Sequence, residues 1–277
     1  MYLITGAEGQ LGRAFVSLFC RKEISFKAFG HRAWDITNEP QTAEIMAPYP
    51  GCTVINCAAY NFVDGAEENQ ELAKNINSEA PATLAALCKR RGGKLIHFSS
   101  DFVFSSNDPT ATFSCDAPVN PINFYGLTKA WGEERVRSNL KNHLIVRTSF
   151  VFGHARTPNI VHKLKDLLEH EHNRGGKPII ATRPISKMTY APDLVKETWK
   201  LIQKNEQGTF HITNSETFCP FELASFLGDK LGVSCAIPGE YQTRAPRPIC
   251  STLDDCPDLP NWMSRVALFL KESPRGI

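Results

Sequence analysis

Two side chains capable of proton transfer lie four residues apart, at Tyr125 and Lys129. In a helix this spacing places a phenol and an ammonium on one face. The ammonium favours the phenolate, which lowers the pKa of the tyrosine and helps it release a proton. Upstream, Ser99-Ser100-Asp101 ends an apolar run, and a serine hydroxyl there could hydrogen-bond a substrate oxygen. The set is suited to protonating a carbonyl oxygen, although the Tyr–Lys pair taken alone is more typical of an exposed helix surface.

A glycine-rich turn supplies the missing context. Thr5-Gly6-Ala7-Glu8-Gly9-Gln10-Leu11-Gly12 follows an apolar run at 2–5 and precedes an amphipathic pattern from Leu11 to Phe19. The glycines permit a sharp bend, close approach of backbone to a pyrophosphate and tight packing of helix on strand. The N–H groups of the first helical turn would then face the phosphates. This context favours a dinucleotide site over a purely structural turn, and so a nicotinamide cofactor that exchanges a hydride.

Short apolar runs alternate with helical patterns up to about residue 150, at 2–5, 26–29, 53–56, 95–99 and 144–148. Strands that are apolar on both faces are typical of a parallel sheet covered by helices. We therefore predict an α/β fold with a doubly wound, Rossmann-type parallel sheet, in which 67–90 forms one long crossover helix.

In the second half of the chain the regular alternation of strands and helices ends. Helices are expected at 160–171, 192–204 and 220–231, with a strand at 208–213 and polar loops at 172–177 and 182–188. The stretch 238–260 carries five prolines and is expected to be mostly irregular. We predict an NAD(P)-binding domain at 1–153 and a smaller substrate-binding lobe at 154–277, with interleaved segments allowed. The cleft between them is the expected ligand site.

Composition excludes several other classes of protein. The 277 residues carry a net charge of only +2, which gives no sign of nucleic-acid binding. No apolar run approaches the roughly 20 residues that span a bilayer, and no signal peptide is evident. The nine cysteines lack CxxC spacing and are expected to be buried free thiols in a reducing cytoplasm. The histidines are scattered, so no metal site is expected.

The motifs resemble those of the extended short-chain dehydrogenases and, within them, the dTDP-4-dehydrorhamnose reductases. The resemblance runs across nearly the whole chain, and the runs Ser-Ser-Asp-Phe-Val-Phe and Pro-Ile-Asn-Phe-Tyr-Gly-Leu-Thr-Lys are the most specific. The segments that carry it are 4–12, Asp35-Ile36-Thr37, 54–60, Val63-Asp64, Ala66-Glu67, 99–104, 121–133, Arg147-Thr148-Ser149, Arg247-Pro248, Ser251 and Leu253.

The resemblance implies a role for each matching residue. Tyr125 would be the proton donor, Lys129 would bind the nicotinamide ribose, and Ser100 would polarise the sugar carbonyl with Asp101 beside it. The implied cofactor-binding residues are Gly6, Gly9, Gln10, Leu11, Asp35, Ile36, Ala59, Tyr60 and Asn61. Asp35 could instead cap a helix, although Asn38 is the better cap before Glu39-Pro40.

The sequence also departs from the family pattern around the substrate. Phe102 stands where these reductases usually carry a tyrosine, and Phe150 where a tryptophan commonly lies against the sugar. Asn61 replaces a usual threonine, and the loop 182–189 is altered, with Arg183 and Lys187 adding positive charge. The resemblance therefore supports the cofactor and the reaction type better than it supports a rhamnose precursor as substrate.

The implied function is NAD(P)H-dependent reduction of the 4-keto group of a nucleotide-linked 6-deoxy sugar. Two alternatives remain: a nucleotide-sugar epimerase or dehydratase, and a non-catalytic NADP-binding regulatory subunit like the methionine adenosyltransferase β subunit. The run at 26–29 leads into Gly30-His31-Arg32 without a carboxylate, and Arg32 could pair with a 2′-phosphate. NADP is therefore expected and NAD is an alternative, unless Arg32 lies in solvent. A homodimer is left open.

Overall fold

A computed structural model describes residues 1–233, 236–240 and 243–272 of the chain. Its centre is a six-stranded sheet in which every neighbouring pair is parallel, in the order β11-β6-β4-β3-β1-β2. The strands are β1 (Tyr2–Thr5), β2 (Phe26–Ala28), β3 (Thr53–Asn56), β4 (Lys94–Ser100), β6 (His143–Thr148) and β11 (Gly208–His211). The predicted doubly wound α/β fold is confirmed, and all five strands expected before residue 150 are present.

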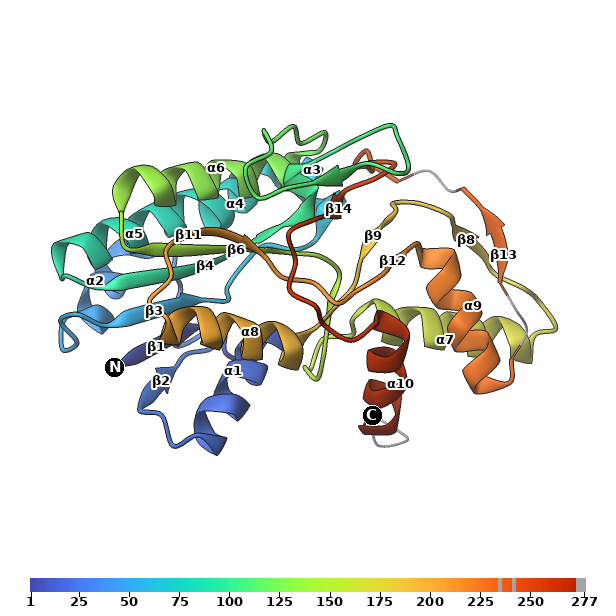
Figure 1. Ribbon diagram of the computed structural model, residues 1–277, viewed down its shortest axis with the longest axis horizontal. Coiled ribbons are helices and arrows are strands. Elements are labelled where there is room, and N and C mark those ends of the chain that lie inside the picture. The colour runs from blue at the N-terminus through green and yellow to red at the C-terminus, as the bar shows by residue number, and fades with distance from the viewer. Residues whose placement is uncertain (234–235, 241–242, 273–277) are drawn as a thin grey trace.

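Helices cover both faces of this sheet, as Figure 1 shows. One face packs against α1 (Gln10–Arg21) and α8 (Ala191–Gln203), whose apolar side chains join those of β1 and β4 in one cluster. The other face packs against α2 (Glu39–Met46), α5 (Ala80–Arg90) and α6 (Phe124–Asn139). Every residue of β4 and β6 is buried, as expected for central parallel strands covered by helices on both faces.

The single long helix predicted at 67–90 is wrong. The structure has α3 (Val63–Glu68), α4 (Gln70–Lys74), a π-helical turn η1 (Asn75–Glu79) and then α5. The first break is at Asn69, whose side-chain amide donates to the Gly65 carbonyl. In the π turn, Asn77 points inward and bonds both the N–H and the carbonyl of Tyr60, at 2.9 and 3.0 Å. These tertiary hydrogen bonds favour a bulged turn over a regular helix.

The second half of the chain does not stay apart from the sheet. β11 pairs with β6 at the sheet edge, and α8 packs against α1. The rest builds a smaller lobe from α7 (Ile160–Asn173), α9 (Pro220–Leu231) and α10 (Trp262–Glu272), around a core that includes Phe152, Phe218 and Phe269. Segments from the two halves of the chain therefore interleave in space. The division at residue 153 between a cofactor-binding part and a substrate-binding part remains a proposal.

Four two-stranded pairs complete the fold: β10-β7, β12-β9, β13-β8 and β14-β5. Their bounds are β5 (Thr112–Phe113), β7 (Val151–Phe152), β8 (Ile179–Ala181), β9 (Ser186–Lys187), β10 (Thr189–Tyr190), β12 (Thr217–Phe218), β13 (Ile237–Gly239) and β14 (Thr252–Leu253). The expected polar loop at 182–188 thus contains a short strand, and a 3₁₀ turn η2 (Asp101–Val103) follows β4. The sequence pattern gave no indication of α10.

The eight cysteines that the structure describes are all free thiols, as predicted, and Cys235 lies outside the described residues. Burial is less uniform than expected, because Cys20 is exposed and three others are only half-buried. Among the described residues, no helix has the length and apolar character needed to cross a membrane. Within the same part of the chain, no group of three or more His, Cys, Asp or Glu is arranged to hold a metal ion.

Candidate active site

A cleft of about 910 Å³ lies where the chain leaves the carboxyl ends of the parallel strands. Its sheet side consists of residues that directly follow β1 and β3 or end β4 and β6, among them Gly9, Cys57, Ser100 and Thr148. The opposite wall comes from the smaller lobe, including α7 and β8. β1 and β3 flank the point at which the strand order reverses, where ligands of doubly wound folds bind.

Helix α6 is anchored at its first turn, directly before Tyr125. The Asn123 side chain caps it by accepting from the Gly126 N–H at 2.8 Å, and its amide donates to the Pro246 carbonyl at 3.0 Å. A Cβ at Gly126 would lie 2.1 Å from the Phe102 carbonyl oxygen, so only glycine allows α6 to pack this closely on η2. This close packing brings Tyr125 against the end of β4.

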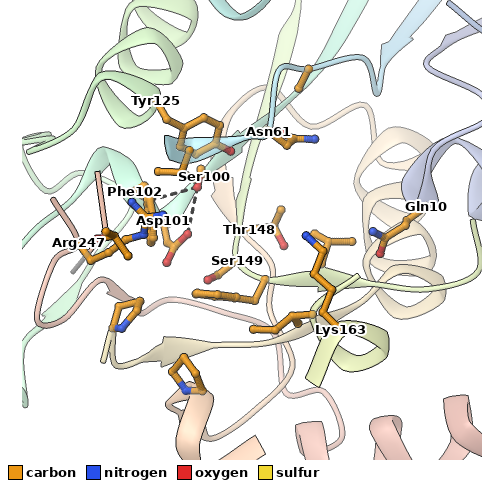
Figure 2. Close-up of a pocket in the computed structure, with 18 of the residues that line it drawn as sticks. Gln10, Asn61, Ser100, Asp101, Phe102, Tyr125, Thr148, Ser149, Lys163 and Arg247 are labelled. Atoms are coloured by element: carbon orange, nitrogen blue, oxygen red, sulfur yellow. Dashed lines mark hydrogen bonds between the residues drawn. The ribbon is translucent and has the colours of Figure 1, made fainter. Parts of the chain in front are cut away.

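Tyr125, Ser100 and Asp101 meet at one wall of the cleft, as Figure 2 shows. The Ser100 hydroxyl donates to Asp101 Oδ1 at 3.0 Å and accepts from the Phe102 N–H at 3.2 Å. Burial raises the pKa of Tyr125 to about 12; a hydrogen bond with Ser100 opposes this rise and the nearby Asp101 adds to it. The lowered tyrosine pKa predicted from the Tyr–Lys spacing is therefore wrong for this structure, because burial dominates. Tyr125 is a protonated phenol at neutral pH and can act as a proton donor.

Lys129 lies one helical turn beyond Tyr125 and is almost completely buried. Its Nζ donates to the Phe98 carbonyl at 2.6 Å. Burial lowers the pKa of Lys129 to about 8, and the Glu133 carboxylate partly offsets this effect. The ammonium is thus largely charged at neutral pH, on the same cleft as the phenol.

Asp101 is enclosed by hydroxyl groups. Its Oδ2 accepts from Ser186 at 2.7 Å and from Ser251 at 2.6 Å, in addition to the Ser100 bond at Oδ1. Burial raises the pKa of Asp101, and the serine hydroxyls counteract that rise. Ser186 and Ser251 belong to the second half of the chain, so these hydrogen bonds connect the end of β4 to that half.

The glycine turn forms the other end of the cleft. Gly6 has φ +58°, and a Cβ there would lie 2.8 Å from the Ala58 N, so the bend requires glycine. Gly9, Gln10 and Leu11 line the cleft, and no side chain caps α1 at Gly9. The Gln10 Oε1 is buried without a hydrogen-bond partner in the described part of the chain. Open N–H groups at the start of α1 fit the phosphates of a dinucleotide.

With this geometry defined, the chain can be compared with known proteins. The model of the family described as the RmlD substrate binding domain matches residues 1–268. The chain belongs to this family. It is similar to the probable low-salt glycan biosynthesis reductase Agl14 of Haloferax volcanii, with 30% identity over 91% of this chain and 88% of that protein.

Two further relatives cover nearly the whole chain. A dTDP-4-dehydrorhamnose reductase of Mycobacterium tuberculosis is 29% identical over 97% of this chain and 91% of that protein. The crystal structure of a dTDP-4-dehydrorhamnose reductase from Bacillus anthracis in complex with NADP superposes with a TM-score of 0.91 at 28% identity. That superposition covers 98% of this chain and 99% of that chain, so the family resemblance inferred from the motifs is confirmed.

Most of the residues expected at the site line this one cleft. They are Gly9, Gln10, Leu11, Ala59, Asn61, Ser100, Asp101, Phe102, Tyr125, Lys129 and Phe150. Phe102 packs edge-to-face on both Tyr125 and Phe150, each with a centroid separation of 6.2 Å. Phe150, which has φ +39°, also packs on Phe218. The two phenylalanines thus form an apolar wall beside the proton donor.

Five expected cofactor residues lie outside the cleft lining. Gly6 shapes the bend behind it, and the Tyr60 backbone is held by Asn77. Ile36 is buried in the sheet core. Arg32 is exposed beyond β2. Asp35 accepts from the N–H and hydroxyl of Thr37, so it caps a turn, while Asn38 caps α2 as the sequence indicated.

Besides Lys129, three cationic side chains line the cleft: Arg183, Arg247 and Lys163. Arg247 pairs with Asp64 at 2.9 Å, and Arg183 pairs with Glu240, which neutralises the positive charge expected from the loop 182–189. Lys187 lies outside the cleft lining. Lys163 reaches into the cleft from α7 (Figure 2). Its spacing is that of an ordinary surface lysine, so no sequence signal could have identified it.

Proposed function

We propose that this RmlD-family protein catalyses the NAD(P)H-dependent reduction of the 4-keto group of a nucleotide-linked 6-deoxy sugar. The observation that carries the proposal is the position of Tyr125, Ser100 and Lys129 on the same cleft as the glycine turn. The similar proteins from M. tuberculosis and B. anthracis are both described as dTDP-4-dehydrorhamnose reductases. In this proposal, residues 1–153 mainly hold the cofactor and the smaller lobe holds the sugar nucleotide.

The reaction assigns a role to each side chain. A bound reduced nicotinamide would supply the hydride, held by Gly9, Gln10, Leu11, Ala59 and Asn61. The Ser100 hydroxyl, oriented by Asp101, would polarise the sugar carbonyl. Tyr125 would deliver its proton to the carbonyl oxygen, and the Lys129 ammonium would stabilise the resulting phenolate. The pKa of about 12 for Tyr125 keeps the phenol protonated at neutral pH, and the pKa of about 8 for Lys129 keeps most of its ammonium charged, as this proton transfer requires.

Replacing Tyr125 with Phe tests this assignment. The ring and its packing on Phe102 remain, so cofactor affinity should hardly change. The proton donor is lost, and kcat should fall by about 10²- to 10⁴-fold. NADPH oxidation would be followed with a panel of 4-keto nucleotide sugars, and Tyr49→Phe, remote from the cleft, would be the control.

Two results would contradict the proposal. Near-normal turnover by Tyr125→Phe would exclude this tyrosine as the donor. A wild-type protein that binds NADPH but oxidises it with none of these sugars would instead favour the non-catalytic, regulatory alternative.

The cofactor proposed is NADPH, with NADH as an alternative. Arg32 lies just after β2, where the adenosine ribose of a dinucleotide is recognised, and it is exposed to solvent. The B. anthracis protein with the same fold is in complex with NADP. A guanidinium at this position could pair with the 2′-phosphate that distinguishes NADPH from NADH.

A further inference from the structure

Lys163 extends into the cleft from the smaller lobe (Figure 2). It is on the second turn of α7, after Asn159, which caps the helix with its side chain. The capping amide also donates to the Gly153 carbonyl at 3.1 Å, so the start of the helix is fixed relative to β7. Figure 2 shows the Lys163 side chain extending from α7 into the cleft, toward the side that holds Thr148 and Gln10.

The charge of Lys163 is uncompensated, in contrast to the other cations of the cleft. Arg183 and Arg247 are paired with carboxylates, and the Lys129 ammonium is bound by the Phe98 carbonyl. Within residues 1–233, 236–240 and 243–272, the Lys163 ammonium has no hydrogen-bond or ion-pair partner. An unpaired ammonium directed into a cleft is suited to an anionic ligand.

The glycine turn lies across the cleft from Lys163, and by itself it would leave part of the negative charge of a bound pyrophosphate uncompensated. The first turn of α1 contains no acidic residue, no side chain caps it, and the Gln10 Oε1 beside it lacks a partner. Backbone N–H groups and the helix dipole supply only about half a positive charge to an anion. A pyrophosphate carries two negative charges, so an ammonium on the opposite wall would complete its neutralisation.

We propose that Lys163 binds the pyrophosphate of the dinucleotide cofactor from the side opposite α1. This inference rests on the proposed function, because it assumes that the glycine turn holds NAD(P). A lysine suits the role, since its compact charge on a flexible chain can follow a phosphate without a fixed geometry. The cofactor would then contact the sheet through α1 and the smaller lobe through α7. The diphosphate of a nucleotide sugar has the same chemistry, and the experiment must separate the two.

The test compares wild type with Lys163→Gln and with Lys165→Gln, which removes the same charge from a position on α7 outside the cleft lining. Dissociation constants would be measured for NADPH, for ADP-ribose and for dTDP. Lys163→Gln should weaken NADPH and ADP-ribose by roughly tenfold and leave dTDP unchanged. The difference should shrink at about 1 M salt, and Lys163→Arg should restore most of the affinity. Lys165→Gln should bind like wild type.

Several outcomes would overturn the inference. Equal NADPH and ADP-ribose binding by wild type and Lys163→Gln would show that the ammonium does not contact the cofactor. A loss confined to dTDP would assign Lys163 to the nucleotide sugar, and an equal loss in Lys165→Gln would indicate a general charge effect. A wild-type protein that binds neither dinucleotide would overturn the proposed function as well, whereas the other outcomes leave that function intact.

Discussion

Burial moves the pKa values of the two proton-handling side chains in opposite directions. The pKa of Tyr125 rises to about 12 and that of Lys129 falls to about 8, in each case because the charged form is disfavoured. Separated pKa values of this kind are common where one group donates a proton and the other stabilises charge. The residue types and their spacing were enough to predict this pair, because four-residue spacing in a helix fixes their common face.

In the proposed cofactor site, the ribose would meet the carboxylate of Glu8, whose position near the end of β2 could not be predicted from the sequence. No acid follows β2 in the chain, but Glu8 of the glycine turn lies against Gly30, so that a Cβ there would be 2.6 Å from the Glu8 Cδ. A carboxylate at the end of the second strand normally accepts from the ribose hydroxyl and repels a 2′-phosphate. In the proposed cofactor site Glu8 would therefore oppose Arg32 in the choice of cofactor, through a proximity to the end of β2 that only the folded turn creates.

Substitutions at these two positions should change cofactor preference in opposite directions. Arg32→Ala should weaken NADPH by about tenfold with little effect on NADH, because only NADPH carries the 2′-phosphate. Glu8→Gln should tighten NADPH and weaken NADH. Titration of both cofactors into wild type and the two variants measures these effects. A preference for NADH that Arg32→Ala leaves unchanged would rule out Arg32 as the phosphate ligand.

At the scale of elements, α6 continues the chemical face of Tyr125 and Lys129 to Glu133, one turn further. Arg147 of β6 donates to both carboxylate oxygens of Glu133, at 2.9 and 2.7 Å, and both side chains are buried. Burial by itself would raise the pKa of Glu133, but the Arg147 guanidinium and its hydrogen bonds hold the pKa below its usual range. This ion pair fixes α6 to the sheet and so fixes the position of Lys129.

Glu133→Gln should lower the free energy of unfolding by about 3 to 5 kcal/mol at neutral pH, because it leaves the buried Arg147 charge without its carboxylate counter-charge. The carboxylate has a depressed pKa in the folded state, so its contribution is complete above the usual carboxyl pKa. It is lost as pH falls through the lower folded value, where wild type and variant should converge. Urea unfolding from pH 7 to pH 3 measures this. Glu134→Gln, an exposed neighbour, should change stability by less than about 0.5 kcal/mol, and an equal effect would contradict the prediction.

Elements with one dominant local signal could be predicted from the sequence, and those shaped by distant contacts could not. The glycine turn, the buried strands and the Asn38 cap each depend on residues close together in the chain. The π turn depends on hydrogen bonds from Asn77 to Tyr60, a partner 17 residues away in the chain. Similarly, apolar periodicity indicates that α8 and β11 exist, but not that they return to the first sheet.

At the scale of the whole molecule, the cleft is assembled by segments that alternate between the sheet and the smaller lobe. Asp101 accepts from Ser186 and Ser251, which lie 85 and 150 residues further along the chain. Asp193 at the start of α8, which packs on the sheet, pairs with Arg265 of α10 in the smaller lobe at 2.6 Å. Such contacts set the width of the cleft. The sequence motifs could therefore name most residues of the site without giving the shape of the pocket.

The pocket wall is the part of this assembly that should decide the substrate. Phe102 follows β4 and Phe150 follows β6, and both line the cleft beside Tyr125, while Phe218 of β12 packs behind Phe150. An apolar wall discriminates weakly between sugars, whereas a wall with hydrogen-bonding groups rejects ligands that lack the matching partner. Compared with the Tyr and Trp usual in the resembling reductases, the two phenylalanines remove a hydroxyl and an indole N–H.

We therefore expect poor turnover of dTDP-4-dehydrorhamnose by the wild type, which the Phe102→Tyr, Phe150→Trp double variant should raise. The measurement is kcat/KM for that sugar in both proteins, with NADPH affinity as the control for an intact cofactor site. Each regained hydrogen bond should contribute about 1 kcal/mol, so an increase of roughly 30-fold in kcat/KM is expected if both groups reach the sugar. Efficient wild-type turnover would instead show that the apolar wall accommodates the usual sugar.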